Sequence, residues 1–344
     1  MERTHFLNKM IPKKEGRGED SDPILYHNDN IIVVGVFDGM GGAGGAECES
    51  DYTVNGQLMT KAYVGSRIVR DAIEIAIKED PSIVIQGSFS ERLKQIINER
   101  HALEKKNYPP KSKVGLRSAL IKEYPTTLAI ISLYKDKNNY LIDSYWAGDS
   151  RNYLWSSKGF FQISIDDLKG NNDPLQNIND DAPMSNCIQA DGPFEIRHQQ
   201  FKLPLGAKFV LFSATDGCFG YYPSPMDFQK ALINSVKASS DFNQLETKLV
   251  EAFEFVTADD FSFSIAFVGY KKFKDLNELR NYDIKLNQYF NFRRDYEEKV
   301  RRKIRLEEEI EAMDEKLKEE IQKLWPLYKD NYLKYMNDYA IEKR

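Results

Sequence analysis

Apolar residues along this chain follow two different periods, one typical of strands and one typical of helices. Residues 31–37 (IIVVGVF) form an unbroken apolar run rich in β-branched side chains, which predicts a buried strand. Residues 47–78 then place apolar side chains, Leu58 among them, at three- and four-residue spacing. We therefore expect one long helix over 47–78, ended by Pro81, and a second helix over about residues 88–106.

Strand-like patterns dominate the middle of the chain. Two apolar runs, 126–134 and 140–149, are separated by a short polar turn and predict an antiparallel hairpin. Helical spacing returns over residues 228–236 and 245–256. Further β-like runs occupy residues 152–155, 159–164, 194–203, 208–217 and 261–270. Strands and helices mixed in this order indicate an α+β fold.

The composition changes after Tyr270. Residues 297–323 are almost wholly charged, with apolar residues at helical spacing, which predicts an amphipathic helix or a short coiled coil. We therefore expect a folded domain over 1–270 and a charged helical extension over 271–344, whose tyrosine-rich end forms another helix. Partner docking, self-association and packing back on the domain are all compatible with such an extension.

Composition excludes several classes of protein. A net charge of −5 over 344 residues argues against nucleic acid as the main partner. Cys48, Cys187 and Cys218 are scattered and form no CxxC pair, so neither a disulfide framework nor a zinc site is indicated. The N-terminus lacks the apolar core of a signal peptide, and no run is apolar enough to span a membrane. We expect a cytoplasmic protein that binds neither nucleic acid nor membrane.

Four aspartates lie at the ends of predicted strands. Asp38, Asp149 and Asp216 each follow a strand, and Asp259 precedes one. Carboxylates gathered at one sheet edge need a cation to offset their repulsion, and oxygen ligands without His or Cys favour magnesium, manganese or calcium. Two such ions would suit phosphoryl chemistry. The alternative is that each Asp-Gly pair, such as Asp38-Gly39, is only a turn.

Four motifs resemble a known family in sequence and in order. They are similar to the signature motifs of the metal-dependent, type 2C serine/threonine protein phosphatases, and they read VFDGMGG (36–42), AGDSRNYLW (147–155), LFSATDG (211–217) and DDFSFSIAF (259–267). The form VFDGMGG resembles that of bacterial members. TTL, GEDSD and FQISIDDL, which begin at residues 126, 18 and 161, resemble further motifs of that family. The resemblance covers roughly residues 10–270.

The resemblance implies a fold and a set of metal ligands. The fold is an α-β-β-α sandwich of two antiparallel sheets flanked by helices. Asp38 would bridge two Mn²⁺ or Mg²⁺ ions, one of which the Gly39 carbonyl would also bind, while Asp216 and Asp259 would complete the ligands of the other. Asp149 would bind a third, weaker ion. The residues that would hold metal-bound waters are Glu19, Asp20 and Asp260.

In that family a water bridging the two metals attacks the phosphomonoester directly. Members often place His after the Asp-Gly pair as a proton donor, but this chain has Met40 there. The basic residue that contacts phosphate would be Arg17 or Lys14. For Ser150 and Arg151 we expect a role in holding the loop, and for Cys218 an inert buried thiol. The histidines His5, His27, His101 and His198 lie outside the motifs and are expected to have surface or packing roles.

These observations predict a metal-dependent serine/threonine protein phosphatase whose partner is a phosphorylated protein. The alternative is a catalytically silent phosphatase-fold module that binds a phosphoprotein or acts as a scaffold. A phosphatase of small phosphoesters would use the same site.

Overall fold

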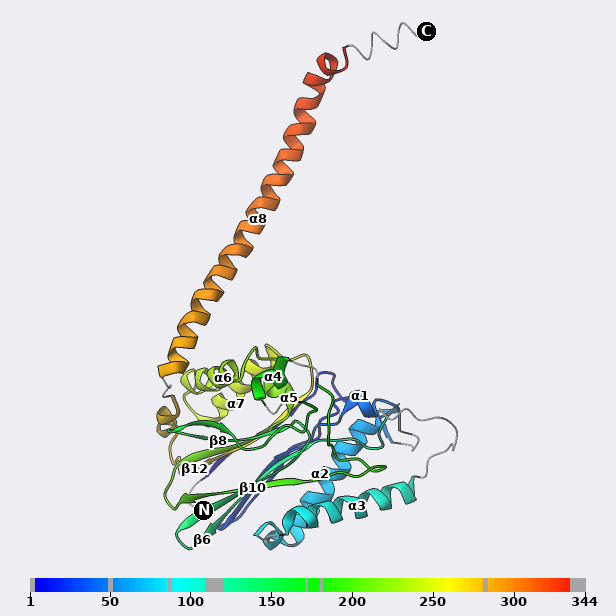
Figure 1. Ribbon diagram of the computed structural model, residues 1–344, viewed down its shortest axis with the longest axis vertical. Coiled ribbons are helices and arrows are strands. Elements are labelled where there is room, and N and C mark those ends of the chain that lie inside the picture. Colours follow the sequence, from blue (N-terminus) through cyan, green and yellow to red (C-terminus); the bar gives the residue numbers. More distant parts are fainter. Residues whose placement is uncertain are drawn as a thin grey trace. The chain divides into compact units, whose positions relative to one another are not determined.

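The chain divides into two units, which are described separately. The computed structural model describes residues 4–48, 52–85, 88–108, 121–170, 173–179, 182–280 and 284–334. The first unit is Met1–Asn281 and the second is Tyr282–Arg344. Figure 1 shows the elements of both.

Two five-stranded antiparallel sheets form the centre of the first unit. One has the strand order β1-β12-β11-β8-β9 and the other β10-β7-β6-β3-β2. The strands of the first sheet are β1 (His5–Ile11), β12 (Phe261–Val268), β11 (Phe209–Ala214), β8 (Arg151–Ser156) and β9 (Gly159–Gln162). Those of the second sheet are β10 (Arg197–Pro204), β7 (Asn139–Ala147), β6 (Leu128–Asp136), β3 (Ile31–Val36) and β2 (Ile24–His27). The predicted strand over 31–37 and the hairpin that follows residue 125 are confirmed.

Strand β3 explains why its sequence is apolar without alternation. Side chains of successive residues in a strand point to opposite faces of the sheet. Ile31 and Val33 belong to a core cluster shared with helix residues, whereas Ile32 and Val34 belong to the cluster between the two sheets. Both faces of β3 are therefore buried, which the layered sandwich requires.

Helices cover the outer faces of both sheets (Figure 1). On one side, α2 (Lys61–Glu79) and α3 (Phe89–Asn107) pack on the β3 sheet through the first of these clusters. On the other, α6 (Pro225–Lys237) and α7 (Phe242–Glu254) cover the β11 sheet, with Phe228 at the centre of an aromatic cluster. The predicted α-β-β-α sandwich is confirmed. Shorter helical turns are α1 (Gly41–Gly44), η1 (Pro81–Ile85), α4 (Pro174–Asn179), α5 (Asp216–Phe219) and η2 (Phe273–Arg280).

The prediction of one helix over 47–78 is wrong for the described residues before Lys61, and residues 49–51 lie outside the described part. Helix α2 begins at Lys61, where the Thr60 hydroxyl accepts a hydrogen bond from the Tyr63 amide. Ahead of it, β4 (Thr53–Val54) and β5 (Gln57–Leu58) form a small hairpin. Asn55 and Gly56 both have positive φ, the conformation of a tight hairpin turn, so this dipeptide overrides the helical spacing.

The first unit extends beyond Tyr270. Leu276 and Leu279 of η2 are buried, and the Arg280 guanidinium donates a hydrogen bond to the Val236 carbonyl of α6. The segment 271–280 therefore belongs to the sandwich rather than to the charged extension.

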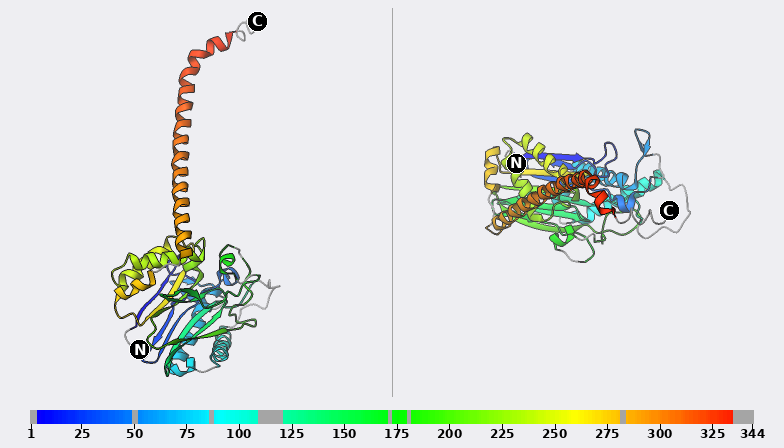
Figure 2. Two further views of the ribbon diagram at one scale, coloured as in Figure 1. Left: turned by 60° about the vertical axis from the view of Figure 1, so that its left-hand side comes forward. Right: turned by 90° about the horizontal axis from the view of Figure 1, so that it is seen from above.

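The second unit contains a single 49-residue helix in its described part, α8 (Ile284–Tyr332). It continues through Pro326, so the described residues after Trp325 do not form a separate helix. Figure 2 shows a bend near its C-terminal end, the expected effect of a proline that removes one backbone donor. Residues 335–344 lie outside the described part. No helix in the described residues is long and apolar enough to cross a membrane.

Candidate metal centre

Asp38 lies in the loop that follows β3, and the start of β6 fixes its backbone. Its amide donates a hydrogen bond to Thr127 Oγ1 at 3.2 Å. Its carbonyl accepts from the Thr126 hydroxyl at 2.7 Å and from the Thr127 amide at 2.8 Å. The TT pair of the TTL motif thus holds the residue that was predicted to bridge two metals.

Residue 39 must be glycine because neighbouring backbone atoms leave no room for a side chain, not because a turn needs its backbone conformation. A Cβ on this residue would lie 2.5 Å from the Glu19 carbonyl oxygen and 2.6 Å from that of Ala62. Gly217 shows the same feature, since its Cβ would lie 1.9 Å from the Asp260 carbonyl oxygen. Neither glycine has the positive φ of a type I′ turn. The alternative that these Asp-Gly pairs are only hairpin turns is therefore wrong.

Asp20 lies closer to Asp38 than its predicted supporting role required. Its buried carboxyl is within hydrogen-bonding reach of the Asp38 carboxyl and accepts from Thr215 Oγ1 at 2.8 Å. The Arg67 guanidinium donates to the backbone carbonyls of Gly18 and Asp20, each at 3.0 Å. This half-buried arginine of α2 anchors the GEDSD loop, and nothing in its sequence context indicated it.

The Asp149 loop is held by two further aspartates. Arg151 forms a buried, two-pronged ion pair with Asp166, with nitrogen–oxygen distances of 2.9 and 2.6 Å. The Asp167 carboxylate accepts from the Gly148 amide at 3.2 Å. The expectation that Arg151 holds this loop is confirmed. Sequence reasoning assigned no role to Asp166 or Asp167, although the similarity of FQISIDDL to a family motif was a signal for both.

Four carboxyl groups from separate segments repel one another at this centre. Burial, and next the charges of the other carboxylates, raise the pKa of Asp38 well above its usual range, and burial followed by Asp259 raises the pKa of Asp216. Burial raises the pKa of Asp20 to about 8, against the hydrogen bond from Thr215 and helped by the charge of Asp216. Burial, followed by the charge of Asp216, raises the pKa of Asp149 to about 7. Such a group is stable in its ionised form only beside a positive charge.

Asp259 and Asp260 have different surroundings. Asp259 is exposed, and its carboxylate accepts from the Asp260 amide at 2.8 Å. Asp260 accepts from the backbone amides of Lys13 and Glu19, each at 2.6 Å, so it fixes the loop before Asp20. Glu19 itself accepts from the Thr60 hydroxyl at 2.5 Å, and burial raises the pKa of its carboxyl.

The donor set fits a hard divalent cation. It consists of carboxylates and backbone carbonyls, the ligands that Mg²⁺ and Mn²⁺ prefer. In the described part of the chain, however, no three His, Cys, Asp or Glu side chains form a group that could hold a metal ion. The carboxyls of Asp20, Asp38, Asp149 and Asp216 are nevertheless near enough for their charges to act on one another, and the exposed Asp259 acts on Asp216.

The two candidate phosphate-binding residues lie on the loop before Glu19. The Arg17 guanidinium is exposed and donates to the Gln57 side-chain oxygen at 2.7 and 2.5 Å. Lys14 is also exposed, and its carbonyl accepts from the Arg17 amide at 3.0 Å. Neither of these hydrogen bonds links the positive charge of Arg17 or Lys14 to the aspartates of the candidate metal centre.

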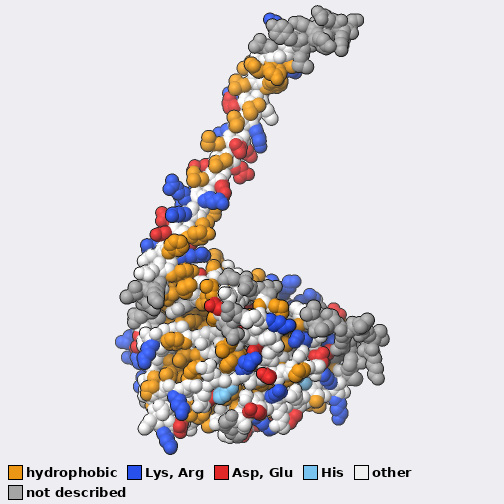
Figure 3. All heavy atoms as spheres, in the orientation of Figure 1, with side chains coloured by type: hydrophobic (Ala, Val, Ile, Leu, Met, Phe, Trp, Pro, Cys, Tyr) orange, Lys and Arg blue, Asp and Glu red, His pale blue; other side chains and the backbone are white. Residues whose placement is uncertain are grey.

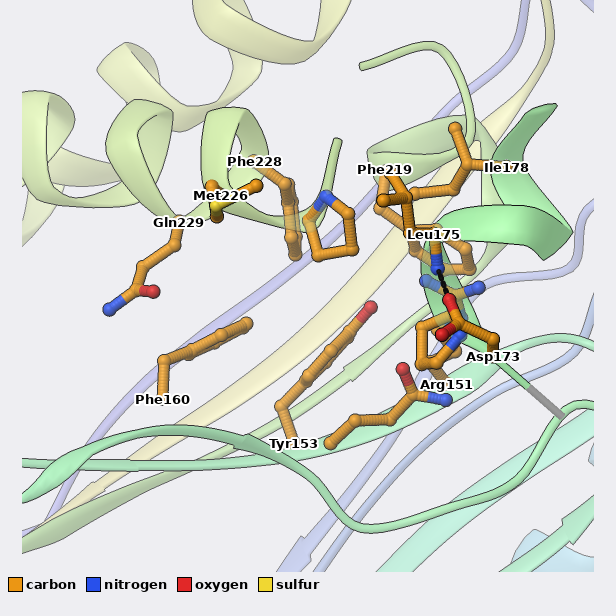
Figure 4. Close-up of a pocket in the computed structure, with 13 residues that line it drawn as sticks. Arg151, Tyr153, Phe160, Asp173, Leu175, Ile178, Phe219, Met226, Phe228 and Gln229 are labelled. Atoms are coloured by element: carbon orange, nitrogen blue, oxygen red, sulfur yellow. Dashed lines mark hydrogen bonds between the residues drawn. The ribbon is translucent and has the colours of Figure 1, made fainter. Parts of the chain in front are cut away.

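Two adjoining pockets open beside this centre. A polar pocket of about 290 Å³ is lined by Asp149, Asp216 and Tyr221, among others. An apolar pocket of about 280 Å³ shares Arg151, Ile178 and Phe219 with it. In Figure 4, Tyr153 and Phe160 of the sheet lie on one side of this second pocket, and Met226 and Phe228 of helix α6 lie on the other. An acidic site is thus continuous with an apolar recess.

The remaining predicted residues take structural roles. Cys218 is fully buried, and burial raises the pKa of its thiol, so it is an inert thiol as expected. His5 and His27 stack on Phe242 and Phe6. His101 is buried in α3, and His198 pairs with Asp143.

No protein-family model and no curated protein matches this sequence. The fold is similar to that of a bacterial serine phosphatase, with a TM-score of 0.52 and 15% identity over 77% of this chain and 97% of that one. It is also similar to the serine/threonine phosphatase Stp1 of Staphylococcus aureus (TM-score 0.53, 16% identity, 78% and 95% of the chains). A sex-determining protein of C. elegans matches with a TM-score of 0.56 at 16% identity, over 82% of this chain and 68% of that one. The predicted resemblance is thus confirmed at the level of the fold: this chain has the sandwich fold of the type 2C serine/threonine phosphatases.

Proposed function

We propose that this chain is a metal-dependent serine/threonine protein phosphatase. The proposal is supported by the mutual repulsion of Asp20, Asp38, Asp149 and Asp216, four carboxyls from distant segments whose pKa values are all raised. Unpaired buried carboxyls destabilise a fold, so their presence together is best explained by a cation that binds between them.

The residues that would hold Mn²⁺ or Mg²⁺ are Asp38, the Gly39 carbonyl, Asp216 and Asp259, with Asp149 for a weaker third ion. Bound there, divalent cations would offset the charge of a phosphoryl group and lower the pKa of a water. The chain's own residues supply the positioning: Thr126 and Thr127 fix Asp38, and the Arg151–Asp166 pair fixes the loop of Asp149.

The adjoining apolar pocket supports a polypeptide substrate over a small phosphoester. A phosphorylated side chain at the acidic centre would place its neighbours near Phe219 and Ile178, which belong to both pockets. An apolar recess of this size suits one side chain of an extended peptide.

The test is hydrolysis of a phosphothreonine peptide with Mn²⁺ and with a chelator, together with calorimetric titration of Mn²⁺. We expect metal-dependent release of phosphate by the wild type. Asp38→Asn and Asp216→Asn should each lower kcat/KM by a factor of about 100 or more, because each removes an anionic ligand. Asp136→Asn, at the exposed end of β6, is the matched control and should leave the rate unchanged.

Other outcomes would change the assignment. Mn²⁺ binding without turnover would favour the alternative, a phosphatase-fold binding or scaffold module. If the wild type does not bind Mn²⁺ at all, the carboxylates do not form a metal site and the proposal is wrong.

A further inference from the structure

Helix α8 exposes an apolar stripe that three charged residues interrupt. Eight of its apolar side chains are more than 40% exposed and recur with the spacing of a heptad repeat, with Phe292 at 73% and Met313 at 68%. Figure 3 shows apolar side chains along this helix. The core positions of the repeat hold Phe292, Tyr296, Lys299, Lys303, Leu306, Ile310, Met313, Leu317, Glu320, Leu324 and Leu327. The pattern lasts about five heptads, long enough for a coiled coil.

The charges of α8 are segregated along its length. Residues 293–305 contain seven basic and three acidic residues, whereas residues 307–320 contain eight acidic and two basic ones. This arrangement is not explained by ion pairs within the helix. Two of those pairs, Arg293–Glu297 and Lys303–Glu307, place the cation on the N-terminal side, which is the less favourable orientation.

A parallel pair of α8 helices would conflict with this sequence. In a parallel, in-register coiled coil each core position meets its own copy. Lys299, Lys303 and Glu320 would then each face a like charge in the core. At the flanks, Glu309 would face Asp314 of the second copy, a further repulsion, and only Arg302 would face an opposite charge, that of Glu307.

An antiparallel pair resolves these conflicts. When Met313 faces Tyr296 of the second copy and Leu317 faces Phe292, the basic half of each helix lies along the acidic half of the other. The flanking positions then bring Glu309 opposite Arg302, Lys316 opposite Asp295 and Asp314 opposite Arg293, and the two-fold axis doubles each contact. Lys299 and Lys303 face Ile310 and Leu306, so their apolar stems cover the stripe.

We propose that α8 is a self-association element, which pairs antiparallel with α8 of a second copy of this chain. The second copy is favoured over an unrelated partner because one sequence supplies both complementary charge blocks. The proposal is independent of the phosphatase activity, since it rests on residues of α8 alone.

The test is the mass of the full-length protein by sedimentation equilibrium, with charge reversals at the flanking positions. We expect the wild type to form a dimer of the 39.8 kDa chain. Arg302→Glu and Glu309→Arg should each raise the dimer dissociation constant about tenfold or more, because like charges then meet twice. The double variant Arg302→Glu/Glu309→Arg should restore the wild-type value.

Matched controls and a discriminating variant make the result decisive. Arg301→Glu and Glu308→Arg introduce the same charge changes on the opposite face of the helix and should leave the dissociation constant unchanged. In a parallel dimer, Glu309→Arg would face Asp314 and tighten the dimer, which would overturn the antiparallel assignment. A wild type that stays monomeric at all concentrations would overturn self-association and leave the stripe to another protein.

Discussion

At the scale of single residues, two glycines of the VFDGMGG segment have opposite surroundings. A Cβ on Gly39 would lie within 2.6 Å of two backbone carbonyl oxygens, whereas a Cβ on Gly42 would meet nothing within 4 Å. Backbone atoms cannot move aside as a flexible side chain can, so Gly39→Ala should lower the free energy of unfolding by about 1–3 kcal/mol. Urea unfolding measures this loss, and Mn²⁺ affinity should fall in the same variant.

Gly42→Ala, in the short helix α1 of the same VFDGMGG segment, is the matched control. Its effect on unfolding should stay within about 0.5 kcal/mol, since the site is open and its φ is not positive. Equal effects of the two substitutions would show that the glycines serve loop flexibility rather than the close approach of Glu19 to the metal centre.

The buried side chain of His101 should make the stability of the fold depend on pH. Burial, followed by the charge of Lys105, lowers its pKa from 6.5 to about 4, and neither ring nitrogen has a hydrogen-bond partner in the described residues. Between pH 6.5 and pH 4, His101 is therefore protonated in the unfolded chain but neutral in the folded chain. The free energy of unfolding should fall by about 1.4 kcal/mol per pH unit as the pH drops from 6.5 toward 4.

The comparison of unfolding curves at pH 7 and pH 5 checks this contribution. His101→Phe should remove that part of the loss, while the exposed His27→Gln should keep it. An unchanged pH profile in His101→Phe would assign the dependence to other groups.

The sequence was informative about single residues where a motif marked them. Asp38, Asp149 and Asp216 could be singled out because each follows an apolar strand, and in the structure the charges of Asp149 and Asp216 act on Asp38. Arg67 could not be found this way, because its role depends on α2 crossing the GEDSD loop. Asp20 was underrated for the same reason: only the fold shows that its carboxyl reaches Asp38.

At the scale of elements, the loop after β7 depends on one buried ion pair. Arg151 and Asp166 are almost completely buried, so Asp166→Asn leaves a guanidinium without its counter-charge. We expect a loss of about 3–5 kcal/mol in the free energy of unfolding, and a fall in activity as Asp149 shifts. Urea unfolding and peptide hydrolysis measure the two effects.

Glu195→Gln is the control for this prediction. Glu195 lies 3.9 Å from Arg197, and both side chains are exposed, so removing its charge should change unfolding by less than about 1 kcal/mol. A loss in Asp166→Asn no larger than that of the control would contradict a structural role for the Arg151 pair.

The end of α2 was predicted well because Pro81 marks it. The predicted helices over 228–236 and 245–256 each missed about one turn at the start, because periodicity ignores the caps that Ser224 and Asp241 provide for α6 and α7. The start of α2 was misplaced because Leu58 fits the helical period by coincidence. The Asn55-Gly56 turn was the stronger signal, and it places Leu58 in an exposed hairpin strand.

At the scale of the whole molecule, strand pairing could not be predicted from periodicity. Strand β1 pairs with β12, about 250 residues later in the chain, and β11 lies between β12 and β8. Alternation of side chains says which face of a strand is buried but not which strand is its neighbour. The resemblance to the phosphatases supplied the two-sheet sandwich that the pattern alone left undetermined.

Because the chain consists of two units, we expect them to unfold in separate transitions. The sandwich has its own core, and a cation at the carboxylate centre stabilises only the state that binds it. The stability of α8, if it pairs with a second copy, depends instead on protein concentration. Heating followed by circular dichroism should therefore show two transitions: Mn²⁺ raises one without moving the other, and dilution lowers the second without moving the first. Asp38→Asn should cancel only the response to Mn²⁺, and Glu309→Arg should lower only the concentration-dependent transition. A single transition that responds to both treatments would mean that the two units unfold together.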